Sequence, residues 1–476
     1  MADIQDETEL KSEIVNRLTR GEFKKAWAGI IGMARKALKK TEGLDPRYED
    51  RDHLRHLIHD CIYAKGGDVS ARARTVELGA VYFHISEKGR ETFHDILAHD
   101  FDIDRQALAE KIKELAEAQN QKEAIAAEID LKNALTPPRI ILLKQFSSLP
   151  NGLKLLIDMR ATLLARVKED QRLYKLALDI KELLAAWFDI GMLDLQEITW
   201  NSPAALLEKL IEYEAVHEIR SWGDLRSRLD SNRLCYAFFH NKMPAEPLIF
   251  VEVALVNKLS SNIQELLNKE DEKTEPEKAS TAIFYSISNT QPGLAGINLG
   301  NFLIKTVVQE LSNEFGNLKH FATLSPVPGF QKWLSPILAA GDESILRPKE
   351  VALLKDHFAC ENGALQLAET LKSEWYTDSA TAEIFRPILS RLCVHYLLEE
   401  KRGSRALDPV ANFHLSNGAR LERINWLADL SKMGLKRSHG IMVNYYYELS
   451  DIEKNHEEYV TKAQIVAGRG VKSLLK

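Results

Sequence analysis

The chain has 476 residues and 45% of them are hydrophobic, which excludes wholesale disorder and allows a sizeable core. It carries 63 Lys and Arg against 69 Asp and Glu, and this net charge of −6 gives no general attraction to nucleic acid or anionic membranes. No run of about 18 apolar residues is present, so the sequence predicts no membrane-spanning helix.

Helical periodicity dominates the first part of the chain, and we predict a helical bundle over residues 1–189. A helix is expected over 22–40. A single long helix is expected over 104–134, followed by helices over 151–172 and 173–188. One apolar stripe of the long helix would consist of Leu108, Ile112, Leu115, Ile125 and Ile129.

From residue 190 onward, strands and helices are mixed, which predicts a second domain over 190–476 and an α+β class for the whole chain. Strands are expected at 234–239, 248–256, 281–287, 321–324 and 441–449. A helix with one apolar face is expected from about Leu299 to Phe315. A largely helical insert is expected over 331–405.

A glycine-rich turn lies between strand 281–287 and the helix that follows it. Its glycines are Gly293, Gly296 and Gly300. Glycine lets backbone N–H groups approach a phosphate, and a helix N-terminus adds unpaired N–H groups, so the turn predicts an anion site. A purely structural turn is the alternative. The pattern resembles the pyrophosphate loop of the GNAT acetyltransferase fold, except that Leu294 occupies the first glycine position.

The cysteine pattern and the N-terminal sequence bear on the cellular compartment. The four cysteines are far apart, which argues against a zinc site or a disulfide framework and fits a reducing compartment. The N-terminal sequence is acidic and has no apolar core, unlike a signal or transit peptide. We therefore expect a cytoplasmic protein.

Long strings in the second part of the chain carry a specific resemblance. They are Glu214–His217, Phe284–Gln291, Gly293–Leu294, Leu299–Gly300, Phe302–Lys305, Leu324–Phe330, Pro409–Leu415, Asn417–Ala419, Arg423–Trp426 and Gly440–Tyr445, together with Tyr447. These strings resemble the malonyl-CoA decarboxylase family over most of residues 190–450, and more loosely over the helical part.

The resemblance implies an enzyme of fatty acid metabolism that converts malonyl-CoA to acetyl-CoA and CO2 without metal, biotin or another cofactor. It implies a helical domain for assembly over residues 1–189 and a GNAT-like α/β catalytic domain over 190–476. It also implies a homotetramer. Family members can carry an interchain disulfide at the position of Tyr213, so that link is expected to be absent here.

Four catalytic residues follow from the resemblance. Ser325 would bind the departing carboxylate or the enolate and relay a proton, and His414, expected to come from a distant strand, would donate the proton to carbon. Tyr447 would support the histidine, and Ser286 would be a further active-site serine. Taken without the resemblance, Ser325 fits an ordinary turn serine, His414 a structural histidine and Tyr447 a core aromatic residue.

The substrate-binding residues expected from the turn are Ala295, Gly296, Ile297, Asn298, Leu299, Gly300 and Asn301. Asn298 stands where several family members have Glu, and because an amide cannot take up a proton, only a binding role is expected for it. The residues Arg423, Asn425 and Trp426 are expected to build a helix packed behind His414.

Two other functions fit parts of the same pattern. A GNAT-type acyltransferase would use the turn for acyl-CoA and would transfer the acyl group to an amine without loss of CO2. A non-enzymatic acyl-CoA sensor would assemble through the large helical part, which carries no visible chemistry. The turn fits both enzymes, and the pair formed by Ser325 and His414 favours the decarboxylase over the acyltransferase.

Overall fold

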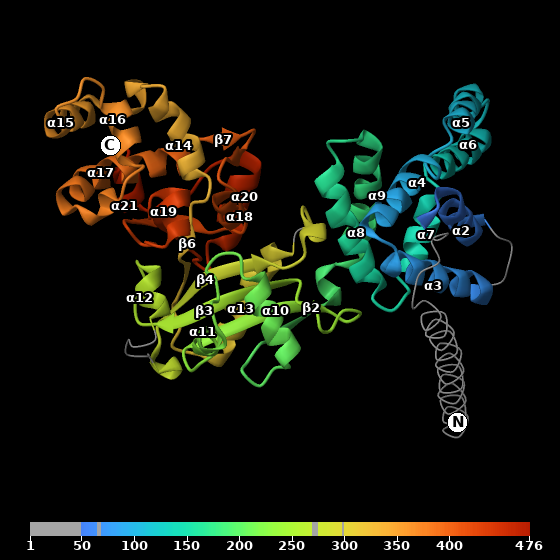
Figure 1. Cartoon of the computed structure of the whole chain (residues 1–476), viewed down its shortest axis with the longest axis horizontal. Helices are drawn as coiled ribbons and strands as arrows, with labels where there is room; N and C mark the ends of the chain where they lie inside the picture. Colours follow the sequence, from blue (N-terminus) through green and yellow to red (C-terminus); the bar gives the residue numbers. More distant parts are fainter. Residues whose placement is uncertain (1–48, 64–67, 269–274, 298) are drawn as a thin grey trace. The chain divides into compact units, whose positions relative to one another are not determined.

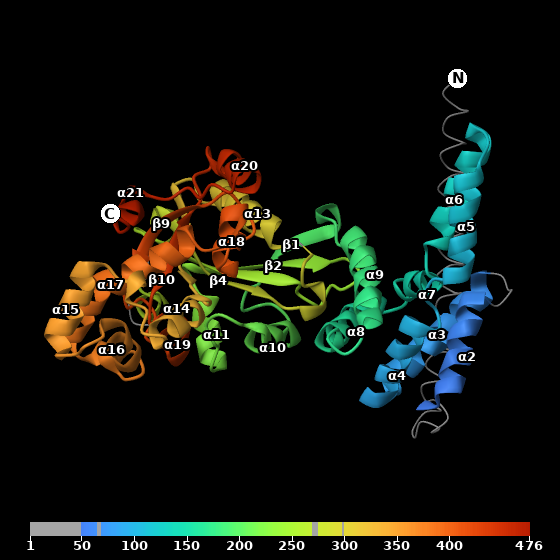
Figure 2. The ribbon, with the colours of Figure 1, turned by 90° about the horizontal axis from the view of Figure 1, so that it is seen from above.

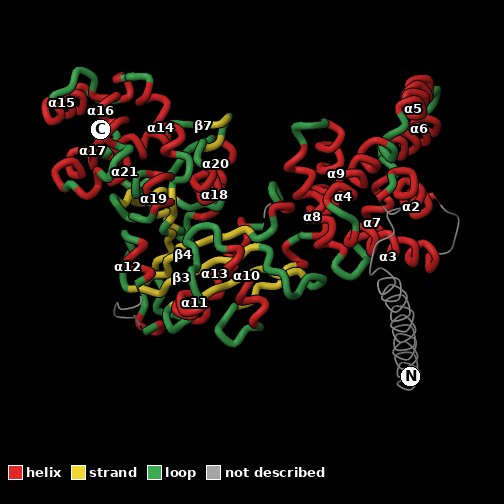
Figure 3. The backbone as a smooth tube through the Cα atoms, viewed as in Figure 1, coloured by secondary structure: helices red, strands yellow, loops and turns green. Residues whose placement is uncertain are grey.

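The structure is a computed structural model that describes residues 49–63, 68–268, 275–297 and 299–476. Its contacts divide the chain into two compact units. The first comprises the described part of Met1–Asp189 with Gln291–Ile297, and the second comprises Ile190–Thr290 with Asn298–Lys476. All described strands lie in the second unit (Figure 3). The predicted α+β class is confirmed, whereas the helix expected over 22–40 lies outside the described residues.

The described residues of the first unit form helices and the loops between them (Figure 1). The α-helices are α2 (Arg51–Tyr63), α3 (Asp68–His84), α4 (Glu87–His99), α5 (Arg105–Glu117), α6 (Gln121–Ala134), α7 (Arg139–Phe146), α8 (Gly152–Arg166) and α9 (Gln171–Trp187). Helices α8 and α9 bury leucine and isoleucine side chains at helical spacing, among them Leu156, Leu163, Leu176, Ile180 and Leu184. A segment from much later in the sequence, Gln291–Ile297, packs with these helices, which the sequence did not predict.

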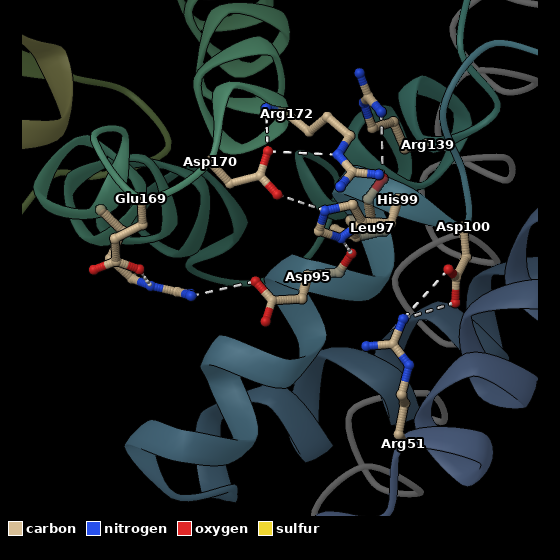
Figure 4. A network of polar contacts seen from close by, with 10 residues as sticks. Arg51, Asp95, Leu97, His99, Asp100, Arg139, Glu169, Asp170 and Arg172 are labelled. Atoms are coloured by element: carbon tan, nitrogen blue, oxygen red, sulfur yellow. Dashed lines mark hydrogen bonds and ion pairs between the residues drawn. The ribbon is translucent and has the colours of Figure 1, made fainter.

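Charged side chains tie the helices of the first unit together. The guanidinium of Arg139 is fully buried and pairs with Asp102 at 3.0 Å and Asp179 at 2.7 Å. Around it, His99 contacts Asp170 at 2.8 Å (Figure 4). Because a buried charge is costly without partners, the two carboxylates around Arg139 make its position specific to this helix arrangement.

The single long helix predicted over 104–134 is wrong, because the chain forms the hairpin of α5 and α6 instead. Ala118 leaves the helical region with ψ of 126°, and Asn120 starts α6 by accepting a hydrogen bond from the N–H of Glu123. The carboxylate of Glu123 in turn accepts from the N–H of Gln119 at 2.9 Å. These caps satisfy donors that a helix end leaves unpaired, so they favour a break that apolar spacing alone does not reveal.

The second unit is organised around one mixed sheet. Its strands are β1 (Leu193–Glu197), β2 (Arg233–His240), β3 (Ile249–Val256), β4 (Thr281–Asn289), β5 (His320–Thr323), β6 (Ser325–Pro326), β9 (Arg420–Asn425) and β10 (Met442–Tyr446). The order is β1-β2-β3-β4-β5-β10-β6, and β9 pairs with β10. Strands β1 to β4 are antiparallel, whereas β4 and β5 are parallel. A parallel pair needs a crossover connection, which α13 (Gly300–Glu314) supplies.

Helices cover this sheet and form the insert that the sequence predicted (Figure 2). Besides α13 they are α10 (Ala204–Tyr213), α11 (Trp222–Arg228), α12 (Ile263–Leu267), α14 (Phe330–Ala339), α15 (Pro348–Phe358), α16 (Gly363–Thr370), α17 (Ser379–Leu398), α18 (Pro409–Ser416), α19 (Lys432–Ser438), α20 (Ile452–Lys462) and α21 (Arg469–Ser473). A two-stranded hairpin, β7 (Lys401–Arg402) and β8 (Arg405–Ala406), precedes α18. Short 3-10 helices are η2 (Ile190–Met192), η3 (Pro276–Lys278), η4 (Pro292–Leu294), η5 (Glu343–Ile345) and η6 (Trp375–Thr377). No described helix is long and apolar enough to cross a bilayer.

Two local predictions near the end of the chain are wrong. His414 comes from helix α18 rather than from a strand, because Asp408 caps that helix by accepting from the N–H groups of Val410 and Ala411. Arg423 and Asn425 lie in strand β9 instead of a helix, where they follow the register of β10.

Candidate active site

The structure brings Ser325, His414 and Tyr447 together inside the second unit. Ser325 stands in β6, opposite Val443 of β10, and its Oγ lies 3.1 Å from Nε2 of His414. The Nδ1 atom of the same ring lies 2.8 Å from the hydroxyl of Tyr447. All three side chains are buried. Two ring nitrogens with two hydroxyl partners make a continuous hydrogen-bonded row from Tyr447 to Ser325.

The imidazole in this row is neutral in the free protein. Burial lowers the pKa of His414 to about 3, because the charged form would lose its hydration. Burial also raises the pKa of Tyr447, so its hydroxyl keeps its proton. The ring of Tyr445 stacks on the imidazole with centroids 4.6 Å apart and fixes its plane. A neutral ring with one N–H can donate toward either hydroxyl, depending on its tautomer.

Thr323 extends the row by one member, and the sequence analysis missed it. The hydroxyl of Ser325 donates to Oγ1 of Thr323 at 2.8 Å, and that oxygen also accepts from the backbone N–H of Tyr445 at 3.2 Å. Thr323 is fully buried. The alternation of side chains along a strand could have predicted this contact. Residues two apart on an extended chain point to the same side, and Thr323 precedes Ser325 by two residues.

A cavity of about 310 Å³ opens onto Ser325 and His414. It is lined by Val216, Phe284, Tyr285, Ser286, Ile287, Asn289, Ser325, Pro326, Pro409, Val410, Phe413 and His414. Its volume falls at the lower end of the range for small-molecule sites. Because most of the lining is apolar, the few hydroxyl and imidazole groups determine how a polar ligand is oriented.

Ser286 reaches the same cavity but does not bond to the histidine. Its hydroxyl lies 2.7 Å from each carboxylate oxygen of Glu214, and the hydroxyl of Ser288 lies 3.1 Å from one of them. The carboxylate also accepts from the backbone N–H groups of Val216 and His217, both at 2.8 Å. Glu214 therefore orients Ser286, a role that the sequence did not predict, although the residue lies in a string that carried the resemblance.

A buried ion pair stands behind these serines. Glu252 of β3 is the register partner of Ser286 and lies 3.1 Å from the guanidinium of Arg228. Burial, reinforced by the nearby Glu214 carboxylate, raises the pKa of Glu252 to about 8. Two carboxyl groups, those of Glu214 and Glu252, thus lie on this side of the cavity together with the guanidinium of Arg228.

The residues predicted to bind substrate fall into both units. Ala295, Gly296 and Ile297 belong to the first unit, whereas Leu299 and Gly300 belong to the second. Asn298 lies outside the described residues. Asn301 lies in the first turn of α13. Their role in binding stays a prediction.

Gly300 has a structural reason to be glycine. A Cβ on this residue would stand 2.6 Å from the ring of Phe413 and 3.2 Å from Ile249. We expect Gly300→Ala to lower the free energy of unfolding by about 1–3 kcal/mol, because overpacking forces the Phe413 ring to move. Denaturant unfolding measures this change.

The matched control for this substitution is Gly316→Ala. A Cβ on Gly316 meets no atom within 4 Å, and this residue follows the same helix. The control is expected to be neutral, or stabilising by about 0.4–1 kcal/mol through lower entropy of the unfolded chain. Equal stabilities of the two variants would contradict the packing argument.

The groups that could hold a metal are sparse in the described part of the chain. No cluster of three or more His, Cys, Asp or Glu side chains suited to a metal occurs among the described residues. The four cysteines are free, and three of them are buried. The arrangement at Ser325 and His414 can donate hydrogen bonds to a developing negative charge and can transfer a proton.

Comparison with known proteins identifies the relatives of this chain. The malonyl-CoA decarboxylase N-terminal domain family matches residues 101–188, and the malonyl-CoA decarboxylase C-terminal domain family matches residues 191–476. The mitochondrial malonyl-CoA decarboxylase of Anser anser anser is 38% identical over 394 residues, which cover 80% of this chain and 78% of the relative.

Solved structures agree with the sequence matches. The crystal structure of malonyl-CoA decarboxylase from Rhodopseudomonas palustris matches with a TM-score of 0.81 and 40% identity, covering 89% of this chain and 99% of that chain. The structure of malonyl-CoA decarboxylase from Agrobacterium vitis matches with a TM-score of 0.79 and 38% identity, with the same coverage of both chains. The likeness thus extends through both units.

Proposed function

The chain belongs to the malonyl-CoA decarboxylase family, and we propose that it converts malonyl-CoA to acetyl-CoA and CO2 through Ser325 and His414. It is accordingly a carboxy-lyase. The observation that carries the proposal is the 3.1 Å contact between these two side chains at the wall of a mostly apolar cavity. Family membership favours this reaction over acyl transfer to an amine and over non-enzymatic sensing.

The chemistry of the reaction fits the groups in the cavity. The bond between the carboxylate carbon and the α-carbon breaks, its electron pair forms the thioester enolate, and neutral CO2 leaves. Ser325 donates a hydrogen bond to the carboxylate or the enolate oxygen, and such preoriented donors supply a large share of catalysis. An apolar wall disfavours the charged carboxylate relative to neutral CO2, so it promotes the forward reaction.

The proton balance gives His414 its role. Decarboxylation of the malonyl group to an acetyl group consumes one proton. His414 is neutral in the free protein, but a substrate carboxylate placed beside it raises its pKa, so the imidazole takes up the required proton as substrate binds. The imidazolium then donates this proton to the α-carbon, directly or through Ser325. The hydroxyl of Tyr447 holds the ring in place throughout.

Glu214 supports the orientation of the substrate. Its carboxylate lies behind Ser286 and accepts the hydrogen bond of that hydroxyl. Like charges repel more strongly where water is scarce. The malonyl carboxylate is therefore directed toward Ser325 and His414 and away from Ser286.

The test of this function is a direct assay. Purified protein is incubated with malonyl-CoA, and acetyl-CoA and CO2 are measured over time, with an added amine in a parallel reaction. Release of both products in equal amounts is the expected result. Folded protein that releases neither, or that acylates the amine without releasing CO2, would refute the proposal. The cytoplasm stays the predicted location, while the goose relative is named as mitochondrial.

We further propose that the chain assembles into a homo-oligomer, expected to be a tetramer, through the hairpin of α5 and α6. These two helices lie side by side and extend away from the other helices of the first unit (Figures 1 and 2). Helix α5 buries no residue and α6 buries only Ala127, whereas Ile112, Ile125 and Ile129 are each at least half exposed. Helices this short are marginally stable unless they pack against a partner. We therefore propose that the same face of a second copy of the chain packs against this exposed apolar face.

Substitution of the apolar face tests this assembly. The double variant Ile112→Lys and Ile129→Lys is expected to shift the protein to a smaller species, because a charge at a buried contact is costly. Light scattering coupled to size-exclusion chromatography measures the mass. The control is Val460→Lys on α20, which changes an equally exposed apolar side chain in the other unit. An unchanged mass in the double variant would contradict the proposed interface.

A further inference from the structure

Arg160 of helix α8 is a buried cation that binds only backbone carbonyls in the described part of the chain. Its Nε donates to the carbonyl of Ala177 on α9 at 3.2 Å. Its two terminal nitrogens donate to the carbonyls of Gly293 and Ala295 in the glycine turn, at 2.5 and 2.8 Å. Burial lowers its pKa, and no described carboxylate pairs with it. A buried guanidinium without a counter-ion leaves positive charge beneath the turn.

The turn is seated tightly on the helix that carries Arg160. A Cβ on Gly293 would overlap with the backbone carbonyl of Ile157, one helical turn before Arg160. Leu294, the next residue, is buried. Backbone atoms cannot give way as a flexible side chain can, so only glycine fits here. The helical unit therefore sets the position of Gln291–Ile297.

Arg160 also determines which way the peptide groups of the turn face. In a trans peptide, the N–H points opposite to the preceding carbonyl, and the described chain has no cis bond. Since the carbonyl of Ala295 faces Arg160, the N–H of Gly296 faces the other way. The N–H groups of Leu294, Ala295 and Ile297 have backbone acceptors, whereas that of Gly296 has none among the described residues.

A second cation lies beside Gly296. The ammonium nitrogen of Lys181, on α9, lies 3.4 Å from the position that a Cβ of Gly296 would occupy. Gly296 is exposed and has a φ of +77°, a conformation that favours glycine. Within the described residues, no carboxylate lies within ion-pair distance of Lys181. One free N–H, one ammonium group and one buried guanidinium thus converge on the same turn.

We propose that Lys181 and the N–H of Gly296 bind a phosphate group of the CoA, and that Arg160 is the positioning residue that holds the turn for them. This inference rests on the proposed function for the identity of the ligand. Phosphate is the chemistry that fits, because a free backbone N–H beside a lysine donates charge-assisted hydrogen bonds to an anion. The buried guanidinium adds attraction that solvent screens only weakly.

The test compares two substrates that differ in their phosphates. Malonyl-CoA carries the phosphates, whereas malonyl-N-acetylcysteamine has the same thioester without them. The preference is the ratio of their kcat/KM values. In Lys181→Ala this preference is expected to fall about tenfold, through a higher KM for malonyl-CoA, because a hydrogen bond to a charged group is lost. Lys181→Arg should restore most of the preference, and high salt should reduce the difference between Lys181→Ala and wild type.

Arg160→Met is expected to lower the same preference more strongly, and Arg160→Lys to recover part of it. The control Arg172→Ala removes an exposed cation from α9 and should keep the wild-type preference. Calorimetry with free CoA gives a readout independent of turnover, and about tenfold weaker binding to Lys181→Ala is expected. Unchanged CoA binding, or equal losses on both substrates, would overturn the inference even if wild-type protein decarboxylates malonyl-CoA.

Discussion

Replacing Ser325 with alanine is expected to lower kcat for malonyl-CoA by about 10²–10⁴-fold, the range for loss of one oriented donor or proton-transfer group. The variant removes the hydroxyl group that contacts Nε2 of His414 and donates a hydrogen bond to Thr323. A cavity then replaces the hydroxyl, while the surrounding strands β6 and β10 keep their pairing. Steady-state release of acetyl-CoA measures the effect.

Two controls separate catalysis from folding in this experiment. Ser312→Ala removes a hydroxyl that bonds only within its own helix, to the carbonyl of Val308, and should keep wild-type activity. Thr323→Val removes the acceptor of the Ser325 hydroxyl and leaves Ser325 in place. We expect a smaller loss of about tenfold for Thr323→Val, the value of one buried hydrogen bond. Activity of Ser325→Ala within threefold of wild type would contradict the assigned role.

The sequence predicted strands β2, β3 and β4 well because their local signals agree with their packing. Strands β2, β3 and β4 are rich in β-branched and aromatic residues, and the turn between β4 and α13 is marked by glycine. The meeting of Ser325 and His414 was predictable only through the resemblance. Ser325 of β6 and His414 of α18 are 89 residues apart in the sequence, and no local sequence pattern predicts that they are in contact.

The predictions failed where a helix cap, or a contact with a residue distant in sequence, determines the structure more strongly than the spacing of apolar residues does. The apolar stripe over 104–134 continues through the break at Asn120, so periodicity alone gave one helix. Glu214 and Arg160 were not predicted because their roles depend on partners distant in sequence. An arginine in an amphipathic helix is ordinarily a surface residue, and only the structure reveals that Arg160 is buried against carbonyls of a remote turn.

His414→Gln is expected to lower kcat by about 10²–10⁴-fold, because the amide can bond to Ser325 and Tyr447 but cannot carry a proton to carbon. The pH profile adds a sharper signature. In the free protein the pKa of His414 is about 3, so the wild-type profile of kcat/KM should have no inflection near the ordinary histidine value of 6.5.

The pH profile of kcat depends instead on the pKa of His414 in the enzyme–substrate complex, where the substrate carboxylate has raised it. The protonated ring is the active form in the complex, so kcat of the wild type should fall as the pH rises through the raised pKa. This basic limb should be absent in His414→Gln. Tyr447→Phe keeps the ring and loses the hydroxyl that orients it, so we expect about a tenfold loss with the limb retained. A wild-type kcat/KM profile that breaks near pH 6.5, or a basic limb of kcat that survives in His414→Gln, would show that another group donates the proton.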